Sequence, residues 1–171
     1  MEKEITVHTT KERRLLELLK ERELVLATAE SCTGGLVAKR ITDVPGSSSA
    51  FAGGVVTYSN EMKMKLLGVK EETLDSHGAV SHETAYEMAR GLSDLTGADV
   101  CVSVTGIAGP DGGSDEKPVG LVYVGISIDK KARTYKLLLG EYGSREKIRT
   151  ATSEFVLGKL IELLESDNVV E

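Results

Sequence analysis

The chain has few aromatic and few metal-binding or disulfide-forming side chains. Tryptophan is absent and aromatic residues make up 4% of the 171 residues, so the core must be built from Leu, Val, Ile and Ala. The two cysteines, Cys32 and Cys101, form no CxxC pair, which argues for reduced intracellular thiols and against a disulfide framework. The three histidines are scattered and match no metal-ligand spacing. We therefore assign no metal and no cofactor.

Clustered positive charge and long apolar runs are lacking as well. The net charge of −6 argues against a general nucleic-acid binder, because such proteins present basic patches to phosphates. It still allows a small anionic substrate that is held by two or three local donors. No apolar run approaches the ~20 residues of a membrane span, and the charged start at residues 1–4 has no signal-peptide core. We expect a cytoplasmic protein without a nucleic-acid or membrane partner.

Helical and strand patterns alternate along the whole chain, without a linker or an internal repeat, which is typical of one α/β domain. Helices are predicted after Ser59, Ser81 and Ser144, each of which is placed to cap a helix. The strands are expected at residues 24–29, 51–58, 100–104, 121–128 and 133–139. The last two are joined by residues 129–131, a link so short that it implies a hairpin. The expected fold is a single-domain three-layer sandwich with a mixed, mostly parallel sheet flanked by helices.

Ser31 stands at the first place where chemistry is expected. It follows a buried apolar strand and precedes Gly34-Gly35, which open a helix. Unpaired N–H groups at a helix start attract anions, including the oxyanion of acyl transfer. Ser31 could therefore be a nucleophile on a strand-to-helix turn, although no GxSxG motif is present. The alternative is that Ser31 or Thr33 only caps the helix, and the pattern leaves both readings open.

Three further segments carry polar groups that could serve a site. Lys63 lies about one turn into the helix after Ser59 and is either a general base with a lowered pKa or a solvated lysine. The Gly-rich loop at 105–120 allows close approach to a ligand, or is a long turn. Arg145 and Arg149, four residues apart on the last helix, could hold a phosphate or lie on a solvated face.

Taken together, these segments resemble the CinA C-terminal domain family, the nicotinamide-mononucleotide amidases. The resemblance covers about residues 10–165 and implies a single amidase domain over residues 1–171. It implies a stand-alone amidase that lacks the N-terminal domain of longer members. The matching stretches, in the family's order, are AESCTGG at 29–35, VPGSS at 44–48, VVTYSNEMK at 55–63, LLGV at 66–69, HGAVS at 77–81 and SVTGIAGPDGGSDEKPVG at 103–120.

The resemblance implies hydrolysis of nicotinamide mononucleotide to nicotinic acid mononucleotide and ammonia, a step of NAD recycling in pyridine nucleotide metabolism. Ser31 would attack the carboxamide carbon after neutral Lys63 has taken its proton, and water would hydrolyse the acyl-enzyme. Tyr58 would orient Lys63 or shuttle a proton. Backbone N–H groups near Thr33 and Gly34 would hold the oxyanion.

The remaining expectations concern substrate binding and assembly. Thr105 and Gly106 would line the substrate pocket, and Arg145 would bind the phosphate, with Arg149 as the second choice. The family resemblance also implies a homo-oligomer. Two alternatives stay open: a non-catalytic nucleotide-binding module in which Lys63 stays charged and binds phosphate, and an enzyme that uses the Cys32 thiol.

Overall fold

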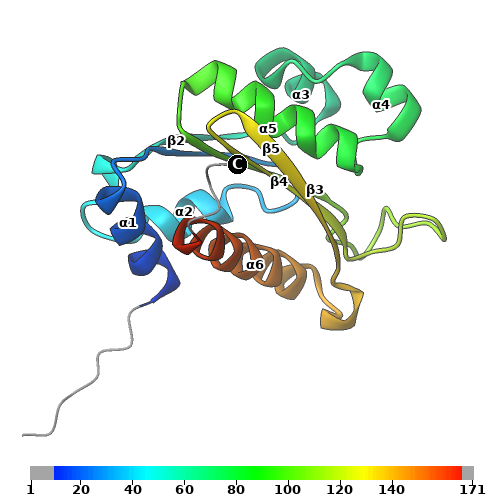
Figure 1. Ribbon diagram of the computed structural model, residues 1–171. Helices are drawn as coiled ribbons and strands as arrows, with labels where there is room; N and C mark the ends of the chain where they lie inside the picture. The colour runs from blue at the N-terminus through cyan, green and yellow to red at the C-terminus, as the bar shows by residue number, and fades with distance from the viewer. Residues whose placement is uncertain (1–9, 167–171) are drawn as a thin grey trace, which may run out of the picture.

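The computed structural model describes residues 10–166, and a five-stranded sheet forms its middle layer (Figure 1). The strands lie in the order β2-β1-β3-β4-β5. Their bounds are β1 (Leu26–Glu30), β2 (Phe51–Val56), β3 (Val100–Gly106), β4 (Leu121–Ile128) and β5 (Lys131–Leu138). β1 pairs in parallel with β2 and β3, whereas the β3–β4 and β4–β5 pairs are antiparallel. The sheet is therefore mixed, as predicted.

Helices cover both faces of the sheet and complete the predicted three-layer α/β sandwich. Figure 1 shows α1, α2 and α6 on one face and α3, α4 and α5 on the other. Their bounds are α1 (Lys11–Glu21), α2 (Leu36–Thr42), α3 (Asn60–Leu67), α4 (Glu71–His77), α5 (His82–Thr96) and α6 (Arg145–Glu165). Within residues 10–166, no helix combines the length and the apolar character that a bilayer span requires.

Local sequence accounts for most helix starts. Ser59, Ser81 and Ser144 cap α3, α5 and α6, each accepting a hydrogen bond from the N–H group three residues on. α4 was not predicted, because only Thr73 and Leu74 of its residues are buried and no apolar period marks it. The β4–β5 hairpin closes more tightly than expected, since β5 already begins at Lys131.

The core is aliphatic, as the composition predicts, and it lies in two layers. On the α1, α2 and α6 side it contains Leu19, Leu26 and Leu157, all fully buried. On the other side, Ala29 of β1 and Leu67 of α3 pack with Met88 of α5. α3 contacts α5 closely, and this packing holds the helix that carries Lys63.

Gly91→Ala is expected to loosen this α3–α5 packing. A Cβ at position 91 would lie 1.7 Å from the Leu67 carbonyl oxygen, so one helix must move. We expect the free energy of unfolding to fall by about 1–3 kcal/mol, as for other overpacked sites. Gly158→Ala in α6 is the matched control, because its Cβ would meet nothing closer than 3.9 Å. Alanine there should stabilise the helix slightly. Urea unfolding gives the free energy of unfolding of each variant. Equal changes in Gly91→Ala and Gly158→Ala would contradict the steric explanation.

Candidate active site

A small cavity of about 260 Å³ lies where β1 and β3 end and α3 begins. Because β1 and β3 run parallel, their carboxyl ends meet at one edge of the sheet, the usual place for ligands in α/β folds. All four sequence segments singled out for chemistry contribute to the lining. The side chains involved are Ser31, Tyr58, Lys63, Thr105 and Arg145, together with backbone at Gly106.

Ser31 and Lys63 lie within hydrogen-bonding distance of each other. The Lys63 Nζ atom is 3.1 Å from the Ser31 Oγ atom. Nζ also donates to the carbonyl oxygen of Thr57 at 2.9 Å and to that of Tyr58 at 3.4 Å. Lys63 is only 1% exposed and Ser31 is 8% exposed. The reading of Lys63 as a solvated surface lysine is therefore wrong.

The surroundings of Lys63 favour its neutral form. Burial lowers the pKa of the Lys63 amine below its ordinary value. Among residues 10–166, no carboxylate forms an ion pair with it that would reverse this shift. A neutral amine has two N–H donors and one lone pair. When the carbonyls of Thr57 and Tyr58 take the two donors, the lone pair is left for the Ser31 hydroxyl, which is the arrangement of a base beside its nucleophile.

The helix start after Ser31 is occupied by a carboxylate from the chain itself. Glu30 is 1% exposed, and its two oxygens accept hydrogen bonds from the N–H groups of Val37 at 2.9 Å and Ala38 at 3.1 Å. α2 begins at Leu36, directly after Gly34-Gly35 as predicted. Its Leu36 N–H group donates to the Thr33 carbonyl, and its next two N–H groups are satisfied by Glu30. A substrate oxyanion cannot use them in this conformation.

The oxyanion donors that remain lie closer to Ser31. The Gly34 N–H group donates to the Ser31 carbonyl at 3.0 Å, so the prediction that Gly34 holds the oxyanion is wrong for this conformation. The Cys32 N–H group lies against its own thiol sulfur, and Cys32 lines the cavity. Thr33 is fully buried and does not line the cavity. The backbone donor of this turn that lies next to Ser31 and at the cavity is therefore the Cys32 N–H group.

The Tyr58 side chain faces Arg145 instead of Lys63. Its hydroxyl accepts a hydrogen bond from Arg145 Nη2 at 2.8 Å, and its contact with Lys63 is made by the main-chain carbonyl. Tyr58 therefore contacts Lys63 through its main-chain carbonyl and not through the side chain that was expected to orient it. Arg145 also donates to the Gly109 carbonyl at 2.9 Å, which places its guanidinium in the lining of the cavity.

Thr105 and Gly106 shape the cavity wall from the end of β3. The Thr105 hydroxyl donates to the Ala79 carbonyl at 2.7 Å and braces the loop before α5. A Cβ at Gly106 would lie 2.7 Å from Cγ2 of Val122, so the tight packing on β4 requires glycine there. Both residues line the cavity, whereas Thr33, Gly34 and Arg149 do not.

The chemistry of the cavity disfavours a thiol nucleophile. Cys32 lines the cavity, but burial raises the pKa of its thiol to about 12. The thiolate is the reactive form, and at neutral pH such a group stays protonated. Ser31 with its adjacent amine is the better nucleophile. Within residues 10–166, no three His, Cys, Asp or Glu side chains gather into a set that could hold a metal ion.

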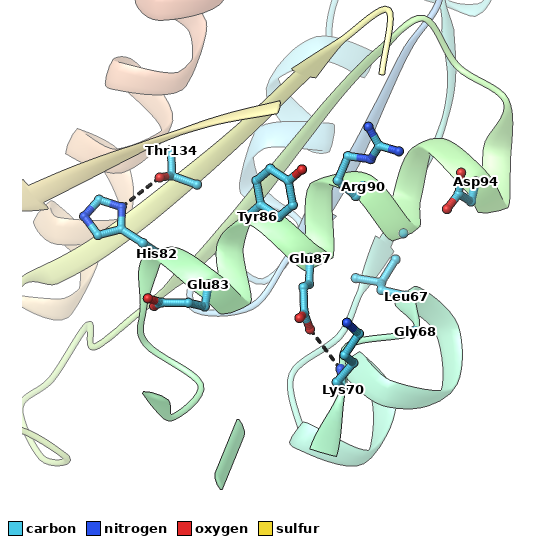
Figure 2. Close-up of a pocket in the computed structure, with 11 residues that line it drawn as sticks. Leu67, Gly68, Lys70, His82, Glu83, Tyr86, Glu87, Arg90, Asp94 and Thr134 are labelled. Atoms are coloured by element: carbon cyan, nitrogen blue, oxygen red, sulfur yellow. Dashed lines mark hydrogen bonds between the residues drawn. The ribbon is translucent and has the colours of Figure 1, made fainter. Parts of the chain in front are cut away.

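A larger hollow of about 540 Å³ lies elsewhere, on the outer side of α5 (Figure 2). Two pairs of polar groups in its lining are hydrogen-bonded. Glu87 accepts from the Lys70 N–H group at 2.9 Å, and His82 Nδ1 lies 2.7 Å from the Thr134 hydroxyl. None of the side chains that the sequence singles out for catalysis lies there. We therefore place the chemistry in the smaller cavity.

Comparison with known proteins places the fold and sequence in one family. Residues 8–164 match the family described as "CinA C-terminal domain". A "Putative competence-damage inducible protein" of Caldanaerobacter subterraneus subsp. tengcongensis is 61% identical over 136 residues, which is 80% of this chain and 32% of that protein. A "CinA-like protein" of Chloroherpeton thalassium is 52% identical over 155 residues, or 90% of this chain and 37% of that protein.

The chain thus spans about a third of the length of these curated relatives. Among solved structures, the competence/damage inducible protein CihA from Agrobacterium tumefaciens superposes with a TM-score of 0.84 at 40% identity. The superposition covers 93% of this chain and 99% of that one.

The depressed pKa of Lys63 predicts a pH-dependent stability. Between the folded-state pKa and the ordinary value of 10.5, the unfolded chain holds a proton that the folded protein lacks. The free energy of unfolding therefore rises with pH in this window, by at most about 1.4 kcal/mol per pH unit. Lys63→Met removes the titrating amine and this contribution. Urea unfolding of both proteins is measured at several pH values up to 10.5. The free energy of unfolding of wild type relative to the variant should increase with pH, and a difference that stays constant would contradict a lowered pKa.

Proposed function

This chain belongs to the CinA C-terminal domain family, and we propose that it is an amidase that converts nicotinamide mononucleotide to nicotinic acid mononucleotide and ammonia. The observation that carries this proposal is the buried Lys63 amine 3.1 Å from the Ser31 hydroxyl. The family resemblance suggests the substrate. The geometry supports the reaction class, because a serine beside a neutral amine is suited to acyl transfer.

In the proposed reaction, the Lys63 lone pair accepts the Ser31 proton as Oγ bonds to the carboxamide carbon. Negative charge moves to the carboxamide oxygen, which the Cys32 N–H group at the cavity stabilises. Lys63 then gives its proton to the leaving nitrogen, the C–N bond breaks and ammonia departs. Water, activated by Lys63, hydrolyses the resulting ester. Throughout, the Thr57 and Tyr58 carbonyls hold the amine in place.

Arg145 is suited to hold the phosphate of the substrate. Its guanidinium is fixed in the cavity lining by the Gly109 carbonyl and the Tyr58 hydroxyl, and these two contacts leave part of its donor fork available. Phosphate is a preferred partner of arginine. The cavity of about 260 Å³ is slightly smaller than the roughly 300–1,000 Å³ of most ligand sites, so in this proposal it holds the reacting part of the substrate and the phosphate lies at its rim.

The non-catalytic binding module is the less favoured function. In that reading Lys63 stays charged and meets a phosphate. A side chain that is 1% exposed and hydrogen-bonded to two carbonyls and a hydroxyl is poorly placed for this. A charge there would also be costly to bury without a counter-ion.

Substitution of the two reacting residues tests the proposal. Ser31→Ala removes the nucleophile and should lower kcat for ammonia release by more than about tenfold, because a lost nucleophile costs several kcal/mol. Lys63→Arg keeps a positive charge but does not deprotonate in the working range, so it should be nearly inactive. Wild-type kcat/KM should rise with pH through the lowered pKa of Lys63.

Calorimetric titration of nicotinamide mononucleotide into the same variants provides the control. Ligand binding should survive in Ser31→Ala, which keeps the cavity. A Lys63→Arg protein with near-normal turnover would contradict the role of Lys63 as base. Normal binding by that variant, together with no ammonia release from wild type, would support the binding module instead.

Arg145→Ala tests the phosphate site. Loss of a charge-assisted hydrogen bond costs roughly 1.5–3 kcal/mol, so KM for the mononucleotide should rise about 10- to 100-fold. KM for the unphosphorylated riboside should change little. Arg133→Ala is the matched control, since Arg133 is an exposed arginine of β5 outside the cavity lining. Equal effects of Arg145→Ala on both substrates would remove Arg145 from the phosphate site.

A further inference from the structure

Arg149 contacts the Ser31 turn without lining the cavity. It lies one helical turn after Arg145 on α6, and its Nη2 donates to the Thr33 carbonyl at 3.0 Å. The same Nη2 would be 3.2 Å from a Cβ at Gly34, so the guanidinium lies directly against the turn. Arg149 does not line the cavity, which counts against its expected second-choice role in phosphate binding.

The Arg149 guanidinium forms no ion pair with a carboxylate of residues 10–166, in contrast to Arg40, which also joins helices. Arg40 of α2 pairs with the carboxylates of Glu12 and Glu154. Arg149 has no carboxylate partner within residues 10–166, and its Nε atom is buried without a hydrogen-bond partner. A buried donor without a partner costs free energy. The resting protein therefore keeps an uncompensated cation beside the turn that carries the nucleophile.

The turn at residues 31–35 is held from two sides. Glu30 anchors its far end by accepting from the first N–H groups of α2, and Arg149 anchors its middle through the Thr33 carbonyl. The Thr33 carbonyl also accepts from the Leu36 N–H group at 3.0 Å, so α2 and α6 both hold this peptide. Ser31 and the Cys32 N–H group lie in the same turn, immediately before Thr33. Preorganised donors are effective because they need no reorganisation as charge develops.

We propose that Arg149 is a positioning residue for acyl transfer at Ser31. Acting through the Thr33 carbonyl, it fixes the turn that carries the Ser31 hydroxyl and the Cys32 N–H group, so that both keep their positions as negative charge develops on the substrate. This inference rests on the proposed amidase function.

Arg149→Gln should lower kcat about 10- to 100-fold and leave KM within threefold, because the missing interaction acts on the transition state. The expected loss is somewhat smaller than that for removal of a direct oxyanion donor. Arg149→Lys keeps the charge without the planar fork and should lose less. Arg40→Gln is the matched control. It removes an arginine that also joins α2 to α6, through Ser153 and Glu154, without touching the turn.

Arg40→Gln should lower the melting temperature but keep kcat within threefold. Three results would overturn the proposal: near-normal kcat in Arg149→Gln, equal kcat losses in Arg149→Gln and Arg40→Gln, or a rise in KM confined to the mononucleotide. Circular dichroism melting checks that each variant folds. Should Arg149→Gln fail to fold, Arg149→Lys carries the test, and a kcat equal to that of wild type would count against the proposal.

The rate at which a fluorophosphonate labels Ser31, followed by mass spectrometry, separates this inference from the substrate assignment. In that reaction Oγ bonds to phosphorus, the proton goes to Lys63, the P–F bond breaks and fluoride leaves. If wild type is labelled but releases no ammonia, the substrate assignment is wrong while the positioning role of Arg149 still stands. In that case Arg149→Gln is still expected to be labelled about tenfold more slowly than wild type. Equal labelling rates would overturn the inference, and a wild-type protein that shows neither activity would overturn both proposals.

Discussion

The Lys63 amine is buried at the end of β2 against two main-chain carbonyls, and the site depends on that burial. In water a lysine is charged and cannot accept a proton near neutral pH. Here the amine is out of solvent, without a carboxylate among the described residues to keep it charged, and hydrogen-bonded to the carbonyls of Thr57 and Tyr58. In the neutral amine, these two contacts use both N–H donors. The nitrogen lone pair is then left to accept a hydrogen bond from the Ser31 hydroxyl, 3.1 Å away.

The rest of the fold maintains this arrangement. Ser59 caps α3 so that Lys63 enters the site one turn later, and the close contact of Gly91 with Leu67 holds α3 against α5. Parallel pairing of β1 with β3 brings Ser31 beside Thr105 at one edge of the sheet. From the other face of the sheet, α6 supplies Arg145 to the cavity lining and Arg149 to the Thr33 carbonyl of the turn that follows Ser31.

Local patterns in the sequence were sufficient for the mixed α/β sandwich, because strand alternation and serine caps are encoded within a few neighbouring residues. They were not sufficient for Lys63. A lysine in a short helix is expected to be solvated unless its contact with a residue distant in sequence, here Ser31, is known. Only the family resemblance assigned it a definite role. The helix start after Gly34-Gly35 was predicted, but the role of Glu30 in satisfying its N–H groups was not. That role depends on how the chain turns between Ser31 and Gly35, which the composition of the segment does not determine.

The protonation state of Lys63 can be measured directly by nuclear magnetic resonance. Lysine side chains labelled with ¹³C and ¹⁵N would be titrated in the folded protein, and the Lys63 signal assigned by its loss in Lys63→Arg. We expect a midpoint clearly below the ordinary 10.5, with the Ser31→Ala variant keeping a lowered value because burial is its main cause. A midpoint at or above 10.5 would mean that the amine stays charged at neutral pH, and it would contradict the role of Lys63 as the base for Ser31.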